Sequence, residues 1–238
     1  MSTSTSTLQG VRVAVTGGTS GLGLALVRAL HAQGARVAFV ARDASRVQRV
    51  AAELAGTHGI AGDIANKTDT HRIALQINAA LGGLDVLVNN ASSLGPVPLA
   101  LLADTECEEL ADALAANLVG PFRLTKALLG SLTASARERR TRTEERAALV
   151  VNISSDAAVT PYAGWGAYGA SKAALLHLSR IWNEELAEHR VRVLSFDPGD
   201  MDTPLHALAV PDADPASLKR PADAARELLA KIVAELAA

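Results

Sequence analysis

The chain has 238 residues, of which 49% are hydrophobic, and its 23 basic and 25 acidic side chains leave a formal charge of -2 at pH 7. This length and apolar content suit a single domain with a substantial core. The near-neutral charge gives no sign of a nucleic-acid or membrane surface, so we expect a small-molecule partner.

The N-terminus and the cysteine content bear on location. Residues 1–9 lack the charged and apolar regions of a signal peptide, and we expect them to form a disordered tail ahead of one domain at residues 10–238. No apolar run is long enough to span a bilayer. The single cysteine, Cys107, cannot form an internal disulfide. These features favour a cytoplasmic protein.

Short β-branched runs alternate with longer helical patterns along the chain. This alternation predicts parallel strands joined by right-handed crossovers, with helices on both faces of the sheet. The fold class we expect is therefore α/β, a doubly wound parallel sheet in three layers. The six predicted strands lie within residues 11–18, 35–41, 57–64, 84–90, 148–155 and 191–199.

Helices are predicted between these strands and after the last one. The longest runs from about residue 104 to 134, with a kink at Gly120 and Pro121. The charged segment at residues 136–146, ARERRTRTEER, is expected to be a solvated connection. The other predicted helices lie at about residues 21–33, around 47–54, near 68–80, around the YGASK segment, and after Pro221.

A glycine-rich loop, TGGTSGLG at residues 16–23, follows the first strand. Gly17 would permit a tight turn, Gly21 would let the backbone approach a pyrophosphate, and Gly23 would allow close packing of the next helix, whose N-terminal amides favour an anion. The spacing differs from the common GxGxxG fingerprint. The loop predicts a dinucleotide site, and the alternative is an ordinary glycine-rich turn.

The end of the second strand indicates which dinucleotide is bound, because a residue there meets the adenosine ribose in dinucleotide-binding folds. A small residue, Ala41, is followed by Arg42, whose guanidinium suits the extra phosphate of NADP(H). We interpret the next residue, Asp43, as the N-cap of the following helix rather than an acid facing the ribose. NADP(H) is therefore favoured over NAD(H).

Tyr168 and Lys172 are four residues apart on a predicted helix, so they lie on one face. Hydride transfer to a carbonyl leaves an alkoxide, which needs an acid and a hydrogen-bond donor. A free phenol titrates at about 10, and a nearby ammonium and an oxidised nicotinamide would lower that pKa. The alternative is a buried helix edge with a lysine that reaches solvent.

Seven motifs follow one another along the chain: TGGTSGLG, GDI with Asp63, NNA at residues 89–91, NLVG with Asn117, NISS with Ser155, YGASK, and DPGDMDT at residues 197–203. In this order they resemble the short-chain dehydrogenases/reductases over about residues 10–230. The resemblance implies a Rossmann-type domain and a catalytic tetrad at Asn117, Ser155, Tyr168 and Lys172.

In this tetrad Ser155 would donate to the same oxygen as Tyr168, and Asn117 could hold a water that relays protons to Lys172. Side-chain alternation along a strand allows only one of Ser154 and Ser155 to face the pocket, and the family spacing selects Ser155. The cofactor contacts expected are Gly17, Thr19, Ser20, Gly21, Leu22, Gly23, Arg42, Asp63, Ile64, Asn90, Ala91, Tyr168, Lys172, Pro198, Gly199, Met201 and Thr203.

Two features depart from the family pattern. Ser92 stands where the family commonly has the glycine of NNAG, which bears on the local backbone and on close approach to the cofactor. The chain also stops after the last predicted helix, so the seventh strand of many members is expected to be missing. Family members pair through the helices that correspond to those bearing Asn117 and Tyr168, and we expect a homodimer.

The segments NNASSLG and PYAGWGAYGASK resemble the sepiapterin reductase and benzil reductase branch of the family. The substrate contacts expected are Ser155, Leu94, Trp165, Met201 and His206, with Val97 and Leu205 as further pocket residues. Such a pocket suits a ketone or diketone. The alternative is that Trp165 and Leu205 fill the core and that His206 is an exposed helix residue.

The function expected is NADP(H)-dependent reduction of a ketone-type or diketone-type carbonyl to an alcohol, with Tyr168 as general acid. One alternative is an NAD-dependent alcohol dehydrogenase of the same fold. Another is a dinucleotide-sensing regulatory protein, since a fold does not fix a function. The six histidines show no metal-ligand spacing, and no metal is expected.

Overall fold

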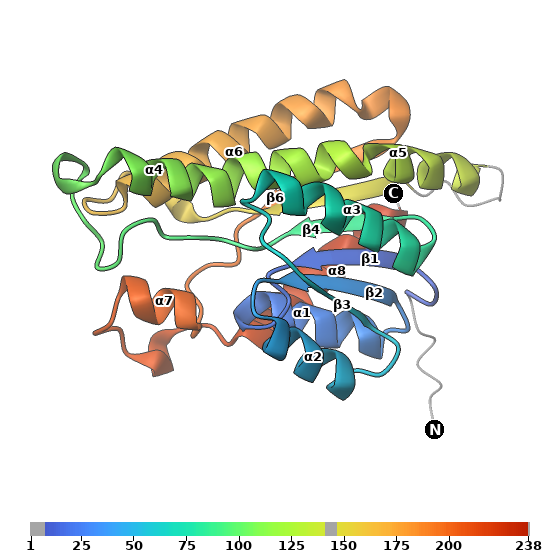
Figure 1. Ribbon diagram of the computed structural model, residues 1–238, viewed down its shortest axis with the longest axis horizontal. Helices are drawn as coiled ribbons and strands as arrows, with labels where there is room; N and C mark the ends of the chain where they lie inside the picture. The colour runs from blue at the N-terminus through green and yellow to red at the C-terminus, as the bar shows by residue number, and fades with distance from the viewer. Residues whose placement is uncertain (1–7, 141–146, 238) are drawn as a thin grey trace.

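The computed structural model describes residues 8–140 and 147–237 of the chain. Its centre is one parallel sheet with the strand order β3-β2-β1-β4-β5-β6 (Figure 1). All six predicted strands are confirmed, and so is the α/β Rossmann-type fold. The strands are β1 (Arg12–Thr16), β2 (Arg36–Ala41), β3 (His58–Ala61), β4 (Val86–Asn89), β5 (Ala148–Ile153) and β6 (Val191–Phe196).

Helices cover both faces of the sheet and complete three layers (Figure 1). Helices α1 and α8 pack together on one face, where α2 also lies, and α3 and α5 pack together on the other, beside α4 and α6. In the described part of the chain, no helix combines the length and apolar character needed to cross a membrane. The helices are α1 (Gly21–Ala32), α2 (Ala44–Glu53), α3 (Lys67–Leu81), α4 (Cys107–Leu114), α5 (Gly120–Arg140), α6 (Gly166–Glu185), α7 (Pro204–Ala209) and α8 (Pro221–Ala237).

The strands are buried on both faces, which explains their continuous apolar sequences. Val13 and Val15 of β1 point into the cluster shared with α1 and α8, whereas Ala14 points into the cluster shared with α3 and α5. The two cores therefore hold the sheet from both sides. The amino and carboxyl edges of the sheet lie outside these two cores, and polar side chains gather there.

Two sequence boundaries need correction. Leu8, placed in the predicted tail, is only 1% exposed and belongs to the core cluster on the α1 side of the sheet. Helix α5 runs to Arg140, so the charged segment at residues 136–146 begins as helix, because Ser135 and Ala136 are buried against the sheet. The rest of the predicted tail, residues 1–7, and residues 141–146 of the charged segment lie outside the described residues.

The predicted kink appears as a π-helical turn, Ala115–Val119, between α4 and α5. Pro121 has no N–H group, and its ring would crowd the carbonyl of Asn117 four residues earlier in a regular helix. The wider turn avoids this, since the Gly120 N–H group donates to the Ala115 carbonyl, five residues back. Such single π turns are frequent at functional sites. Here the turn carries Asn117.

An ion pair fixes the amino edge of the sheet. Asp85, which precedes β4, is 1% exposed, and its carboxylate accepts hydrogen bonds from the Arg12 backbone N–H at 2.7 Å and from the Arg12 guanidinium at 2.8 and 3.2 Å. The Ser135 hydroxyl of α5 donates to the same carboxylate. One side chain therefore joins β1, β4 and α5.

Replacing this carboxylate tests the arrangement. Asp85→Ala leaves the largely buried Arg12 guanidinium without its main partner, so we expect the free energy of unfolding to fall by about 3 kcal/mol in urea denaturation. The control is Glu53→Ala, which removes the ion pair between Glu53 and Arg28. These two side chains are 51% and 50% exposed, respectively. The control should cost less than about 1 kcal/mol. Equal losses in the two variants would contradict the assignment.

Candidate active site

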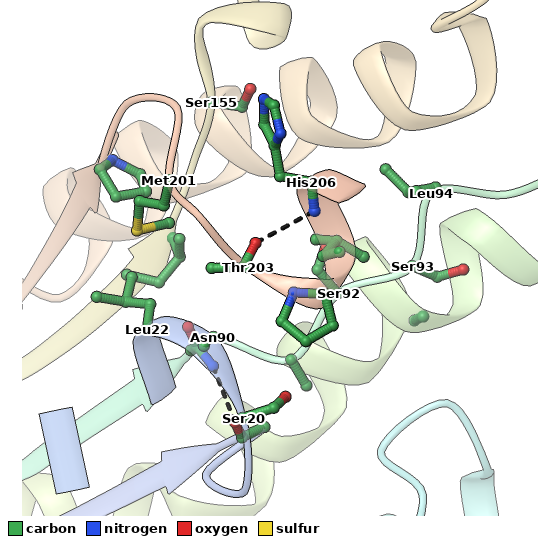
Figure 2. A pocket seen from close by; sticks show the side chains of 18 of the residues that line it. Ser20, Leu22, Asn90, Ser92, Ser93, Leu94, Ser155, Met201, Thr203 and His206 are labelled. Atoms are coloured by element: carbon green, nitrogen blue, oxygen red, sulfur yellow. Dashed lines mark hydrogen bonds between the residues drawn. The ribbon is translucent and has the colours of Figure 1, made fainter. Parts of the chain in front are cut away.

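A cleft with a volume of about 490 Å³ opens at the carboxyl edge of the sheet. The strand order reverses between β1 and β4, and ligands of open parallel sheets bind in the crevice that this reversal creates. The loops that follow all six strands contribute to its lining. Figure 2 shows the part of the cleft formed by the glycine loop, the segment after β4, the end of β5 and helix α7.

The glycine loop is held in place by the segment after β4. The Asn90 side chain donates to the Thr16 carbonyl at 2.8 Å, and the Thr16 hydroxyl accepts from the backbone N–H groups of Asn90 and Ala91 at 2.9 and 3.0 Å. Gly17 has a φ of 70°, which favours glycine. Thr16 was not among the predicted site residues, although it is a polar residue that ends an apolar strand.

Gly23 lies behind the loop and does not line the cleft. A Cβ atom there would stand 2.2 Å from the Gly17 carbonyl oxygen and 2.5 Å from the Asn90 side-chain nitrogen. This confirms the close packing predicted for Gly23 and corrects its inclusion among cofactor contacts. The loop thereby brings its backbone to the start of α1.

The start of α1 fits a pyrophosphate. Ser20, at the N-cap, makes no side-chain capping hydrogen bond, and the first turn of α1 contains no acidic residue. The unpaired N–H groups of a helix N-terminus, together with its dipole, favour an anion. Thr19, Ser20, Gly21 and Leu22 line the cleft at this point. The residues present therefore suit the dinucleotide predicted from the sequence.

The adenosine end of the cleft contains Arg42 and a second arginine, Arg46. Asp43 caps α2, as predicted: its carboxylate accepts from the backbone N–H groups of Ser45 at 2.9 Å and Arg46 at 3.1 Å. The hydrogen bond from the Ser45 hydroxyl, at 2.7 Å, and then that from the Arg46 N–H group lower the pKa of Asp43. The sequence reasoning missed Arg46, which the first turn of α2 brings beside Arg42.

Tyr168 and Lys172 of α6 both line the cleft, with exposed fractions of 8% and 2%. The Lys172 ammonium donates to the Ile153 carbonyl at the end of β5, at 2.8 Å, and lies 5.5 Å from the centre of the Tyr168 ring. The edge of Trp165 packs against the same ring, with centroids 5.7 Å apart. The phenol is thus fixed between the end of β5 and the first turn of α6.

Burial dominates the acid–base properties of the pair. It raises the pKa of Tyr168 above its ordinary value of 10.0, although hydrogen bonds from Ser155 and Ser92 lower it in part. Burial also lowers the pKa of Lys172 from 10.5 to about 8. The shift of the Tyr168 pKa comes from burial, Ser155, Asp197, Asp156 and Ser92. The expectation that Lys172 and an oxidised nicotinamide together lower this pKa stays a prediction.

Asn117 is 1% exposed and lies behind the cleft wall rather than in it. Its side-chain oxygen accepts from the Ser93 N–H group at 2.8 Å and the Ser92 hydroxyl at 3.1 Å. Its side-chain nitrogen donates to the Ser93 carbonyl at 2.7 Å and the Ser171 hydroxyl at 2.8 Å. All four positions of the amide are occupied. The side chain is therefore a clamp with no hydrogen-bonding position left for a water, and the water relay expected at Asn117 stays a prediction.

Both serines at the end of β5 line the cleft, contrary to the expectation that only one would face it. Strand alternation does not apply, because β5 ends at Ile153. Ser155 donates to the Asp156 carboxylate at 3.0 Å, and Tyr162 donates to the same carboxylate at 2.8 Å. The bond from Tyr162, which has the larger effect, and the bond from Ser155 both lower the pKa of Asp156. A charged carboxylate therefore lies beside Ser155.

The substrate end of the cleft is largely apolar. Leu94 is 4% exposed and clusters with Tyr168, while Trp165 and Leu205 pack against them. His206 is half-buried, not exposed as in one reading of the sequence, and its ring points into the cleft, toward Ser155 in the view of Figure 2. Val97 is 49% exposed and does not line the cleft, so its predicted pocket role is wrong.

Every other predicted site residue lines this one cleft. Among the residues that the structure describes, no group of three or more histidine, cysteine, aspartate or glutamate side chains could hold a metal ion. The cofactor and substrate residues brought together are Gly17, Thr19, Ser20, Gly21, Leu22, Arg42, Asp63, Ile64, Asn90, Ala91, Leu94, Ser155, Trp165, Tyr168, Lys172, Pro198, Gly199, Met201, Thr203 and His206.

Comparison with known proteins agrees with this geometry. A family model described as short chain dehydrogenase matches residues 12–214. A serine 3-dehydrogenase of Agrobacterium fabrum is 34% identical over 193 residues, covering 80% of this chain and 72% of that protein. A sepiapterin reductase of Xenopus laevis is 33% identical over 175 residues, covering 74% of this chain and 60% of that protein.

Solved structures show the same fold. A short chain dehydrogenase of Shigella flexneri complexed with NADP has a TM-score of 0.82 and 26% identity, covering 92% of this chain and 89% of that one. A 3-ketoacyl-(acyl-carrier-protein) reductase of Brucella melitensis complexed with NADH has a TM-score of 0.84 and 25% identity, covering 93% and 90%.

The packing of Gly23 can be tested directly. Gly23→Ala forces the loop away from α1, and we expect NADPH binding, measured by fluorescence titration, to weaken on the order of tenfold or more. Gly130→Ala is the matched control, because a Cβ atom at that helical glycine meets nothing within 4 Å. If Gly23→Ala bound NADPH as tightly as Gly130→Ala does, the loop would not depend on this contact.

Proposed function

Because the chain belongs to the short-chain dehydrogenase family, we propose that it reduces a ketone or diketone to an alcohol with NADPH, and that Tyr168 is the general acid. One observation carries the proposal: a buried phenol faces the cleft with Lys172 on the same helix and Ser155 beside it. The groups around this phenol and at the adenosine end of the cleft support the proton step, the cofactor preference and the substrate class.

The proton step follows from the environment of Tyr168. When bound, a reduced nicotinamide cofactor would supply the hydride. Burial keeps the Tyr168 phenol protonated at neutral pH, so it can donate its proton to the oxygen that gains negative charge. Lys172, held by the Ile153 carbonyl, places a positive charge near the resulting phenolate. Ser155 is placed to stabilise the same substrate oxygen.

The preference for NADPH rests on the adenosine end of the cleft. Arg42 and Arg46 both line it, and a guanidinium is well matched to a phosphate. The one acidic residue between them, Asp43, uses its carboxylate to cap α2. Solved relatives include one complexed with NADP and one complexed with NADH, so the arginines support the preference and the family alone does not.

The substrate class is inferred from the catalytic end. Leu94, Trp165 and Leu205 form an apolar wall around Tyr168, which suits a neutral, flat carbonyl compound. An NAD-dependent alcohol dehydrogenase would use the same groups in reverse, and the arginines at the adenosine end favour NADPH over NAD. A dinucleotide sensor would have no use for a buried lysine beside a buried tyrosine.

The homodimer and the cytoplasmic location expected from the sequence stay predictions.

The function is tested by a screen of ketones, diketones and quinones, followed by NADPH absorbance, with the wild-type chain and Tyr168→Phe. The wild type should reduce at least one class. Tyr168→Phe should reduce it more slowly by about 10²-fold or more, because the phenyl ring has no proton to donate, while NADPH binding stays nearly intact. Near-normal turnover in Tyr168→Phe would overturn the assignment, and inactivity of the wild type across the screen would favour the sensor.

Cofactor preference is tested by Arg42→Ala. Loss of a charge-assisted contact with the extra phosphate should weaken NADPH binding by about tenfold or more and leave NADH binding unchanged. Arg49→Ala is the control, because Arg49 is an exposed arginine of the helix that follows Arg42, α2, and does not line the cleft. A similar loss for NADPH and NADH, or none for either, would mean that Arg42 does not select the cofactor.

A further inference from the structure

Ser92 is a departure from the family pattern that the proposed reaction leaves without a role. It follows the NNA segment that holds the glycine loop, at a position where the family commonly has glycine. In the structure Ser92 lines the cleft, and its hydroxyl donates to the Asn117 side-chain oxygen at 3.1 Å. A glycine would leave this bond unmade.

Asn117 fixes Ser92 relative to α6. Its side-chain nitrogen donates to the Ser171 hydroxyl at 2.8 Å, and the Ser171 hydroxyl donates to the Tyr168 carbonyl at 2.6 Å. Asn117 and Ser171 are buried, with exposed fractions of 1% and 0%. A chain of hydrogen bonds therefore runs from the Ser92 hydroxyl through a clamp to the helical turn that carries the phenol.

Ser92 also lines the same cleft as Tyr168 and Ser155. Ser155 and Ser92 are the two side chains whose hydrogen bonds lower the pKa of Tyr168 against the effect of burial. These serines come from different loops, one after β5 and one after β4. The phenol thus shares the cleft with two hydroxyl groups from separate loops.

We propose that Ser92 is a positioning residue for Tyr168, and that its hydroxyl turns from Asn117 to donate to the phenolic oxygen once Tyr168 has given up its proton. A hydroxyl has one proton to donate, so it serves one partner at a time. The turn leaves no buried acceptor unpaired, because the Asn117 oxygen keeps the bond from the Ser93 N–H group at 2.8 Å. The inference rests on the proposed proton transfer from Tyr168.

The ionisation of Tyr168 can be measured without any substrate. The chain has two tyrosines, so in a Tyr162→Phe background the ultraviolet absorbance of tyrosinate reports Tyr168 alone. In this background we compare the phenolate fraction at a pH on the acid side of the Tyr168 ionisation. Ser92→Ala should lower that fraction by about threefold to fivefold, which corresponds to the loss of one hydrogen bond. Ser92→Thr, which keeps a hydroxyl, should restore it.

Ser93→Ala is the matched control for this titration. It removes the neighbouring hydroxyl, which accepts a hydrogen bond from the Gly95 N–H group at 3.3 Å. It keeps both hydrogen bonds between the Ser93 backbone and the Asn117 side chain. The titration of Tyr168 should then be unchanged. An equal change in Ser93→Ala and Ser92→Ala, or no change in Ser92→Ala, would overturn the proposal. Ser92→Gly, the common family residue, provides a second hydroxyl-free variant if Ser92→Ala does not fold.

Turnover gives a second readout. With Tyr162 intact, Ser92→Ala should reduce kcat by about threefold to fivefold without a matching rise in the KM for NADPH, because the hydroxyl acts on the proton step. A rise in KM alone would mean that Ser92 only shapes the cofactor site and would overturn the proposal. The outcomes remain separable, because an inactive wild type would defeat the proposed function while the titration still decides the role of Ser92.

Discussion

A buried ammonium has to find a hydrogen-bond acceptor inside the protein, and the catalytic end of this cleft is arranged around that requirement. Lys172 is 2% exposed and meets it at the carbonyl of Ile153, the last residue of β5. The bond ties α6 to the carboxyl edge of the sheet. Because Tyr168 lies one helical turn before Lys172, the same bond directs the phenol into the cleft. The position of the acid is thus a consequence of where the lysine can be satisfied.

A second set of hydrogen bonds joins α6 to the loop after β4 through Asn117. Asn117 can reach both because it lies in the π-helical turn ahead of Pro121. The same loop carries Asn90, whose side chain holds the glycine loop by the Thr16 carbonyl. The glycine loop, the segment after β4 and helix α6 are therefore linked by direct contacts. A displacement of the segment at residues 89–95 would reach both the cofactor end and the phenol.

Local patterns in the sequence predicted the parts of the molecule that depend on local physics. β-branched runs located the six strands, glycine spacing located the phosphate loop, and the spacing of Tyr168 and Lys172 located the helix face. Partners distant in the chain were not visible in this way. Asn117 bonds to Ser93 and Ser171, which lie 24 and 54 residues away, and these contacts give it a clamping role that local patterns did not indicate. Leu8 was missed for a similar reason, since its burial depends on a core formed by other elements.

The electrostatics of the cleft also depend on tertiary contacts, and they decide the protonation state of the free site. Burial and the charges of Asp197 and Asp156 raise the pKa of Tyr168, while the hydroxyls of Ser155 and Ser92 oppose them. Burial lowers the pKa of Lys172 to about 8, so its charge is retained at neutral pH and lost in mild alkali. At neutral pH the free site therefore holds a protonated phenol beside an ammonium. In this state the phenol has a proton to donate, and the buried phenolate that donation leaves costs free energy unless positive charge or hydrogen-bond donors stabilise it.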